Sequence, residues 1–96
     1  MAAEERIGML QEAIKNKELD GILLVYSRDI LYYTGTAQPS YLAVLPDDFM
    51  LFVRSGIEFA SDEVFISRER IREERKLKNV FSGYFNAGEK KYKRIG

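Results

Sequence analysis

The spacing of apolar positions predicts a helix at the start of the chain, followed by a strand. Ile7, Leu10 and Ile14 recur at intervals of three and four, which places them on one face of a helix spanning residues 4–17. The uninterrupted apolar run over residues 22–26 predicts a strand that is buried on both faces. A helix and then a buried strand are typical of an α/β fold.

A short helix and a hairpin are expected next. Ser27 has the side chain of a helix N-cap and Gly35 is suited to end a helix, so residues 28–34 are expected to be helical. Two apolar segments, residues 41–45 and 49–54, then flank a Pro-Asp-Asp sequence that favours a turn. Together they predict an antiparallel hairpin.

Residues 57–78 are interpreted as two helical segments. Apolar residues fit one helix face in the first segment. The second segment, rich in Arg and Glu, follows a break near Ile66 and Ser67. The Ser67 hydroxyl is a candidate cap for this second segment.

The end of the sequence predicts one more strand and a basic tail. Residues 80–85 are rich in aromatic residues and favour a strand, and a turn at residues 86–88 leads into the lysine-rich residues 89–96. The order of elements predicts a single domain, residues 1–96, of the α/β class, with a mixed sheet flanked by helices.

Composition removes several kinds of active site. The 96 residues include no histidine and no cysteine, so imidazole bases, thiolate nucleophiles, zinc ribbons and iron–sulfur clusters are excluded. Neither glycine-rich phosphate-binding motif occurs in the sequence. The sequence contains neither a signal peptide nor an apolar run long enough for a bilayer, so we expect a cytoplasmic protein with no membrane contact.

Charge is distributed unevenly, although the formal net charge is zero. Residues 1–67 carry five basic and eleven acidic side chains, a net of −6, and residues 68–96 carry ten basic and four acidic, a net of +6. Basic residues with interleaved aromatic residues are compatible with binding to single-stranded nucleic acid. No RNA-binding signature occurs, however, and we favour solvated surface charge and no nucleic acid partner.

Tyr32-Tyr33-Thr34-Gly35 is the most specific element of the sequence, and it stands between an expected strand and an expected hairpin. The residues of the wider pattern are Arg6, Leu10, Asp20, Leu23, Val25, Tyr32, Thr34, Gly35, Leu42, Val44, Leu51, Phe52 and Val53. In these residues the chain resembles the N-terminal domain of the creatinase/prolidase/aminopeptidase P family. Thr36 departs from the pattern, since the family usually has an aromatic residue after the glycine.

The resemblance implies a mixed α/β sheet with a ribonuclease H-like motif and no catalytic residue in this chain. In that family a separate pita-bread domain holds the active site, and in the peptidases two divalent metal ions, expected to be manganese or cobalt, act there on bonds next to proline. The chain is then a truncated N-terminal accessory domain of a Xaa-Pro dipeptidase or aminopeptidase. It would lack the catalytic domain and bind no cofactor itself, and a proline-containing peptide would be the substrate of the parent protein.

The resemblance also implies a homodimer and a position near the substrate entrance. Loops near the Tyr-Tyr-Thr-Gly element approach the partner's active site in such enzymes, which makes Arg28, Tyr32 and Tyr33 the candidate substrate-access residues. No catalytic and no metal-binding residue is assigned. The alternative is a stand-alone interaction module that dimerises through an exposed sheet edge or apolar patch, without a peptidase domain.

Overall fold

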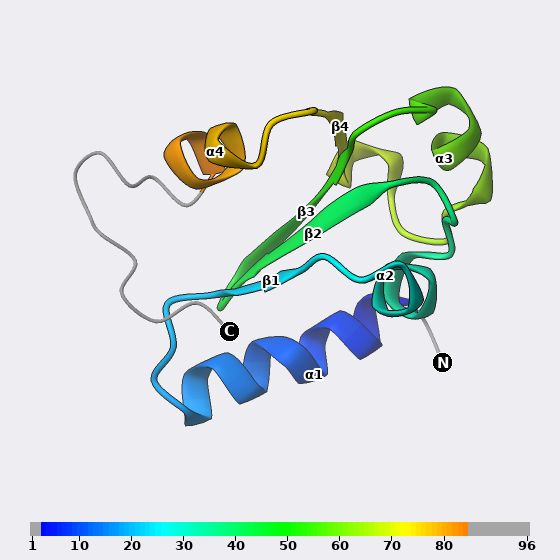
Figure 1. Cartoon of the computed structure of the whole chain (residues 1–96). Coiled ribbons are helices and arrows are strands. Elements are labelled where there is room, and N and C mark those ends of the chain that lie inside the picture. The colour runs from blue at the N-terminus through cyan, green and yellow to red at the C-terminus, as the bar shows by residue number, and fades with distance from the viewer. Residues whose placement is uncertain (1–2, 85–96) are drawn as a thin grey trace.

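This computed structural model describes residues 3–84; the turn expected at 86–88 and the basic tail expected over 89–96 lie outside the described residues. Within this range, one mixed sheet lies between helices (Figure 1). Among the described helices, none combines the length and apolar character that a membrane crossing needs. The elements are α1 (Ala3–Asn16), β1 (Ile22–Leu24), α2 (Ser27–Thr34), β2 (Ser40–Leu45), β3 (Asp48–Val53), α3 (Ile57–Glu63), η1 (Arg68–Arg70), β4 (Ile71–Glu73), α4 (Leu77–Asn79) and η2 (Val80–Tyr84).

The strands lie in the sheet in the order in which they occur in the chain, β1-β2-β3-β4. β1 pairs antiparallel with β2, β2 antiparallel with β3, and β3 parallel with β4. The expected α/β class with a mixed sheet flanked by helices is confirmed. The expected hairpin is also confirmed, because Leu45 pairs with Asp48 and leaves Pro46 and Asp47 as the turn.

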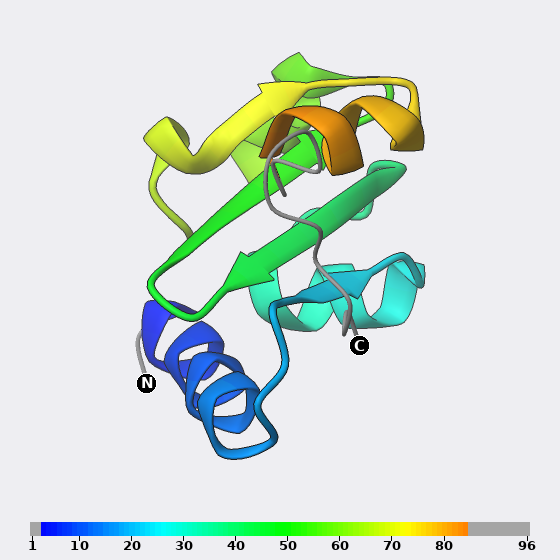
Figure 2. The ribbon, with the colours of Figure 1, turned by 90° about the vertical axis from the view of Figure 1, so that its left-hand side faces the viewer.

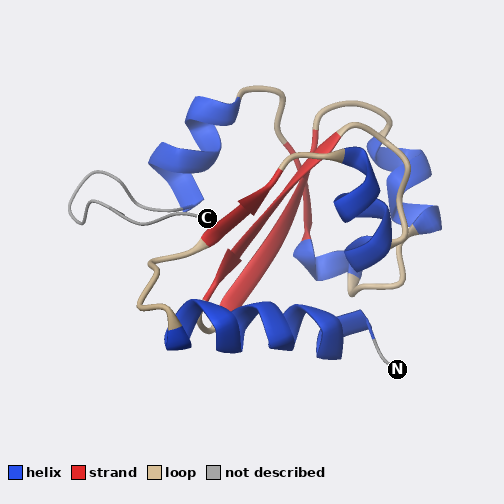
Figure 3. Ribbon diagram, turned by 60° about the horizontal axis from the view of Figure 1, so that its bottom comes forward, coloured by secondary structure: helices blue, strands red, loops and turns tan. Residues whose placement is uncertain are grey.

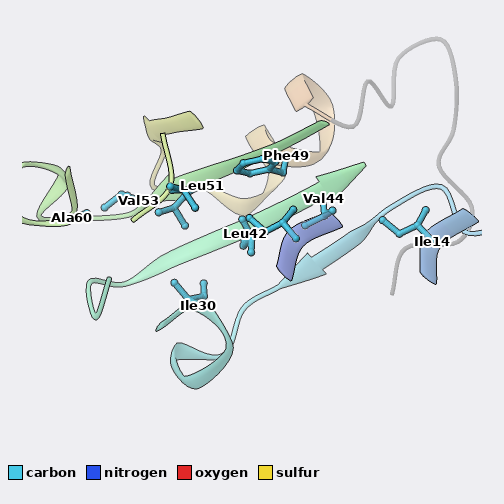
Figure 4. Close-up of a cluster of buried hydrophobic side chains, with 10 residues drawn as sticks. Ile14, Ile30, Leu42, Val44, Phe49, Leu51, Val53 and Ala60 are labelled. Atoms are coloured by element: carbon cyan, nitrogen blue, oxygen red, sulfur yellow. The ribbon is translucent and has the colours of Figure 1, made fainter. Parts of the chain in front are cut away.

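The two faces of the hairpin bury different side chains, because neighbouring residues of a strand point to opposite sides. Leu42 pairs with Leu51, and both face the core that α1, α2 and α3 cover (Figure 4). Ala43 pairs with Met50 on the other face, where they pack with Val80. The views from two sides show α1 and α2 on one side of the sheet and α4 on the other (Figure 1, Figure 2). Figure 3 shows the same layers by element type.

The strand predicted over residues 80–85 is wrong, because its described part is helical. α4 continues into η2, which is a π-helical turn. Leu77, Val80 and Tyr84 are three and four residues apart, and all three pack on the second face of the hairpin. The rings of Phe52 and Tyr84 meet edge to face, with centroids 5.6 Å apart. A helix presents these side chains on one side, whereas a strand would alternate them.

The second helical segment predicted within residues 57–78 is also wrong. The expected cap is present, since Ser67 Oγ accepts a hydrogen bond from the Glu69 N–H at 3.4 Å. The capped segment is the short 3₁₀ helix η1, which leads directly into the parallel strand β4. Ile71 pairs with Leu51 and packs against the main core. Pairing between distant segments therefore overrides the local helix preference of the charged residues.

β1 differs from the prediction of a strand buried on both faces. It ends at Leu24, its three residues are only half-buried, and Val25 and Tyr26 are exposed. Within residues 3–84 it pairs with β2 alone, so it forms an edge of the described sheet. Ser27 is the first residue of α2 and not its N-cap; the cap position is Tyr26, whose side chain makes no capping hydrogen bond.

The predicted end of α2 at Gly35 is confirmed. Its φ of 93° is left-handed, and its N–H donates to the Leu31 carbonyl at 2.9 Å. A Cβ at this position would lie 2.8 Å from Cδ2 of Phe65 and 3.0 Å from the Glu63 carbonyl oxygen. Both the backbone conformation and the available space therefore require glycine.

Replacing Gly35 with alanine should lower the free energy of unfolding by about 1–3 kcal/mol, because the left-handed conformation is costly for a residue with a Cβ. Gly8→Ala is the matched control: it lies inside α1, and its Cβ would meet nothing within 4 Å. That change should raise stability by about 0.5–1 kcal/mol through helix propensity. Urea denaturation followed by circular dichroism measures both, and equal effects of the two variants would contradict the assignment.

Candidate functional site

Loops from distant parts of the chain gather at one end of the sheet. The carboxyl ends of β1, β3 and β4 meet the amino end of β2 there, because only β2 runs in the opposite direction. We call this end the carboxyl edge, and it comprises residues 25–28, 36–41, 54–56 and 74–75. α2 and α3 lie beside it (Figure 1). In open α/β sheets, ligands bind outside the carboxyl ends of strands, which makes this edge the candidate site.

Buried threonine hydroxyls hold the loop that precedes β2. Thr34 and Thr36 are fully buried. Thr34 Oγ1 donates to the Ile30 carbonyl at 2.6 Å and accepts from the Thr36 N–H at 3.4 Å. Thr36 Oγ1 accepts in turn from the Gln38 N–H at 3.1 Å. The polar residue that departs from the expected aromatic position is therefore part of the hydrogen-bond network that shapes the loop.

Glu63, the last residue of α3, ties this loop to its helix. Its carboxylate accepts hydrogen bonds from Thr36 Oγ1 at 2.6 Å and from the Ala37 N–H at 3.2 Å. The Thr36 hydrogen bond is the main cause that lowers the pKa of the Glu63 carboxyl below its ordinary value. The ionised form of this exposed side chain is therefore the one that the folded loop favours.

The loop after β3 contacts the loop before β2. The Arg54 N–H donates to the Pro39 carbonyl at 2.8 Å. Gly56 has a left-handed φ of 74°, and a Cβ there would lie 2.6 Å from Oε1 of Gln38. The left-handed φ favours glycine at this position, whereas the flexible end of the Gln38 side chain could move away from a Cβ.

Two adjoining hollows open at the carboxyl edge. One, of about 390 Å³, is lined by Pro39, Arg54, Ser55 and Arg75. The other, of about 330 Å³, shares Pro39 and Arg54 with the first. Its lining consists of Val25, Tyr26, Ser27, Ala37, Gln38, Pro39, Ser40, Tyr41 and Arg54. Neither lining includes a carboxylate, so both hollows are electropositive or neutral.

Of the three predicted substrate-access residues, Arg28 lies at the carboxyl edge. It is exposed in the first turn of α2 and lines a third hollow of about 430 Å³ with Tyr26, Ser27 and Asp29. Tyr32 follows Arg28 by four residues, which places both on one face of α2. Its side chain is 55% exposed.

Tyr32 and Tyr33 have different surroundings. Arg6 joins Tyr32 to α1: its Nη1 donates to the Tyr32 carbonyl at 2.9 Å, and its Cζ lies 4.6 Å from the Tyr32 ring centroid and 5.7 Å from that of Phe65. Tyr33 packs against the main core, and burial is the main cause that raises the pKa of its hydroxyl. The structure thus brings Arg28 and Tyr32 to one exposed face and turns Tyr33 inward.

Sequence reasoning missed Arg54, Arg75, Gln38 and Tyr41 as site residues. Arg54 follows the end of β3, so the predicted hairpin could have placed it at a strand end. Arg75 was assigned to a helix, and its position became apparent only with β4. Within residues 3–84, no cluster of acidic side chains is arranged to hold a metal ion.

Known proteins resemble this chain in sequence pattern and in fold. The sequence model of the creatinase/prolidase N-terminal domain matches residues 6–96. The solved structure of aminopeptidase P, a Xaa-Pro aminopeptidase from Streptococcus thermophilus, matches with a TM-score of 0.73 and 15% sequence identity, over 91% of this chain and 68% of that chain. At this identity, the likeness shows the fold alone. No match was found among curated proteins.

Glu63→Gln should weaken the loop before β2 and remove part of the acid sensitivity of the fold. Because the folded state lowers this pKa, the contribution of Glu63 is present above the ordinary glutamate pKa of about 4.3 and is lost as the pH falls through the lowered value. Amide hydrogen exchange at Ala37 and Gln38 between neutral pH and pH 3 measures it. Glu58→Gln, an exposed change on the same helix, is the control; identical profiles for both variants would contradict this role.

Proposed function

Because the chain belongs to the creatinase/prolidase N-terminal domain family, we propose that it is the non-catalytic N-terminal domain of a Xaa-Pro dipeptidase or aminopeptidase. In this proposal it shapes substrate access and takes part in a homodimer. A separate catalytic domain with manganese or cobalt ions cleaves a proline-containing peptide. The family match over residues 6–96 carries the proposal, and the fold shared with an aminopeptidase P supports it.

The exposed face of α2 supports the substrate-access role. Arg28 and Tyr32 combine a positive charge with an aromatic ring on one face of a helix whose ends are held. The Arg6 guanidinium lies over the Tyr32 ring and also contacts the Phe65 ring, and Gly35 stops the helix. Such a face would present the same two side chains to each substrate entering a neighbouring active site. Tyr33, which packs inward, would act by positioning Tyr32, whose ring lies 4.9 Å away edge to face.

Exposed apolar side chains support the homodimer. Seven large apolar residues of the described chain remain exposed, and α2 carries two of them. Large contiguous exposed apolar patches mark surfaces that bind other proteins, and these seven residues are the candidates for such a patch. They are Met9, Val25, Tyr26, Leu31, Tyr32, Phe59 and Phe65. The same observation favours the second candidate, a stand-alone dimerisation module without a peptidase domain.

The purified 96-residue chain should not hydrolyse Xaa-Pro dipeptides, with or without added manganese or cobalt, because it contains no histidine or cysteine and no described acidic cluster to hold the metal. Release of free proline measures this. Turnover that appears with metal and disappears with a chelator would contradict the non-catalytic role.

The chain should form a dimer that Leu31→Lys weakens about tenfold or more, since burying one leucine side chain is worth about 1.5–3 kcal/mol. Leu31 is 50% exposed, so the variant should fold. Glu69→Lys adds the same positive side chain to η1, which precedes β4 and so lies at the other end of the sheet. Sedimentation equilibrium measures both, and an equal change in the two variants would rule out α2 as the interface.

The substrate-access role is tested by the kinetics of the protein that joins this domain to its catalytic domain. If the domain shapes access, Arg28→Ala and Tyr32→Ala should lower kcat/KM for Xaa-Pro dipeptides several-fold while the dimer persists. Unchanged kinetics in both variants would contradict a role of these two side chains in substrate access.

A further inference from the structure

We propose that the carboxyl edge carries a binding site for a small organic oxyanion, a carboxylate or phosphate group attached to an aromatic body. Arg54 and Arg75 hold the anionic group in the 390 Å³ hollow. The body of the ligand extends past Pro39 into the 330 Å³ hollow between Tyr26 and Tyr41. The site uses neither Arg28 nor Tyr32, and it does not depend on the peptidase partnership proposed above.

The parallel pairing of β3 and β4 brings the two arginines together. Val53 pairs with Glu73, and the Val53 carbonyl accepts from the Glu74 N–H at 2.9 Å. Arg54 and Arg75 therefore leave adjacent strands at the same end, and their side chains line the same hollow with Pro39 and Ser55. Two like charges held near each other by the backbone repel, and an anion between them relieves that repulsion.

Two carboxylates beside the carboxyl edge, those of Glu74 and Glu63, have other partners. Glu74 accepts from Nδ2 of Asn79 at 2.9 Å and from the Lys76 N–H at 3.2 Å. Glu63 accepts from Thr36 and Ala37. The ion pairs within residues 3–84 are Lys15–Glu12, Arg68–Asp62 and Arg70–Asp48. Neither Arg54 nor Arg75 belongs to these pairs, so both guanidinium groups remain available to a ligand.

The orientation of Arg54 suits the shared boundary of the two hollows. Its Cζ lies 5.5 Å from the Tyr41 ring centroid, a cation–π contact that holds the guanidinium beside the aromatic wall. Its backbone is fixed by the hydrogen bond to Pro39. An arginine held in this way binds an oxyanion with little further loss of side-chain freedom, and its planar donors match two oxygens at once.

The second hollow supplies the remaining contacts for the ligand. Tyr26 is 74% exposed, and Tyr41 offers a ring on the side of Arg54. Gln38, Ser27 and Ser40 add polar groups to the lining. An aromatic ring can pack against these tyrosines, which favours a ligand with a planar body over a bare anion.

Titration of the full chain with inorganic phosphate, acetate, phenyl phosphate and benzoate tests the proposal by isothermal calorimetry and amide chemical shifts. We expect at least one aromatic anion to bind more tightly than its inorganic or aliphatic counterpart, with amide shifts at residues 38, 40, 41 and 54–56 and weaker binding at higher salt. The phosphate and carboxylate series show which oxyanion the site prefers. Arg54→Gln and Arg75→Gln should each weaken binding about tenfold or more, as loss of a charged hydrogen-bond donor does.

Arg72→Gln is the matched control, since it removes the same charge from an exposed residue of β4 that lines a different hollow. It should change the affinity less than twofold, which corresponds to a difference of about 0.4 kcal/mol in binding free energy. Three outcomes would overturn the site: no saturable binding of any probe, equal binding of phenyl phosphate and phosphate together with equal binding of benzoate and acetate, or a loss in Arg72→Gln as large as in the other two variants. If Arg54→Gln unfolds the protein, Arg75→Gln alone decides, because no hydrogen bond of the described fold uses its side chain.

Discussion

The register of the β2–β3 hairpin is the constraint on which the rest of the structure depends. A turn of two residues, Pro46 and Asp47, sets Leu42 opposite Leu51 and Ala43 opposite Met50. A slip of one residue would send each side chain to the opposite face. Both faces are covered, one by α1, α2 and α3 and the other by α4 and η2, so such a slip would disrupt two cores at once. Antiparallel sheets commonly have one face in water, and there a slip would disrupt one core only.

The two ends of the sheet differ in how far their polar side chains are used in contacts within the fold. At the turn, Asp48 joins segments far apart in the chain: its carboxylate pairs with Arg70, and its carbonyl accepts from Nε2 of Gln11 at 3.2 Å. Tyr84 lies near this end, and burial, with a smaller effect of Asp48, raises the pKa of its hydroxyl. The turn end is therefore occupied by internal contacts. The carboxyl edge instead combines a hydrogen-bonded frame with exposed arginine and tyrosine side chains.

The sequence was a good guide wherever the deciding physics is local. Helix α1 follows from the spacing of its apolar residues, and the hairpin follows from its turn residues. The end of α2 follows from a glycine, which readily adopts a left-handed φ. β4 could not be predicted in this way, since its three residues, Ile-Arg-Glu, become a strand only because Leu51 offers a partner. The helical turn at Val80 was predicted as a strand for a related reason. Its apolar residues pack on the second face of the hairpin, and the sequence alone does not show this contact. The proximity of Arg54 and Arg75 could not be predicted for the same reason, because only the pairing of β4 with β3 brings Arg75 beside Arg54.

The distribution of hydrogen-bond partners distinguishes recognition from catalysis at the carboxyl edge. A chain without histidine or cysteine has carboxylates as its ordinary proton-transfer groups. Glu63 and Glu74, two of the acids next to this edge, accept two hydrogen bonds each, and both have a lowered pKa, with the Thr36 and Asn79 side chains as the main causes. A general base at neutral pH needs the opposite shift. The two adjoining hollows offer a ligand arginines, which do not transfer protons, together with tyrosine, serine and glutamine side chains. The proposed anion site fits this arrangement, and the hydrogen bonds within its loops reduce the entropy that would be lost on binding.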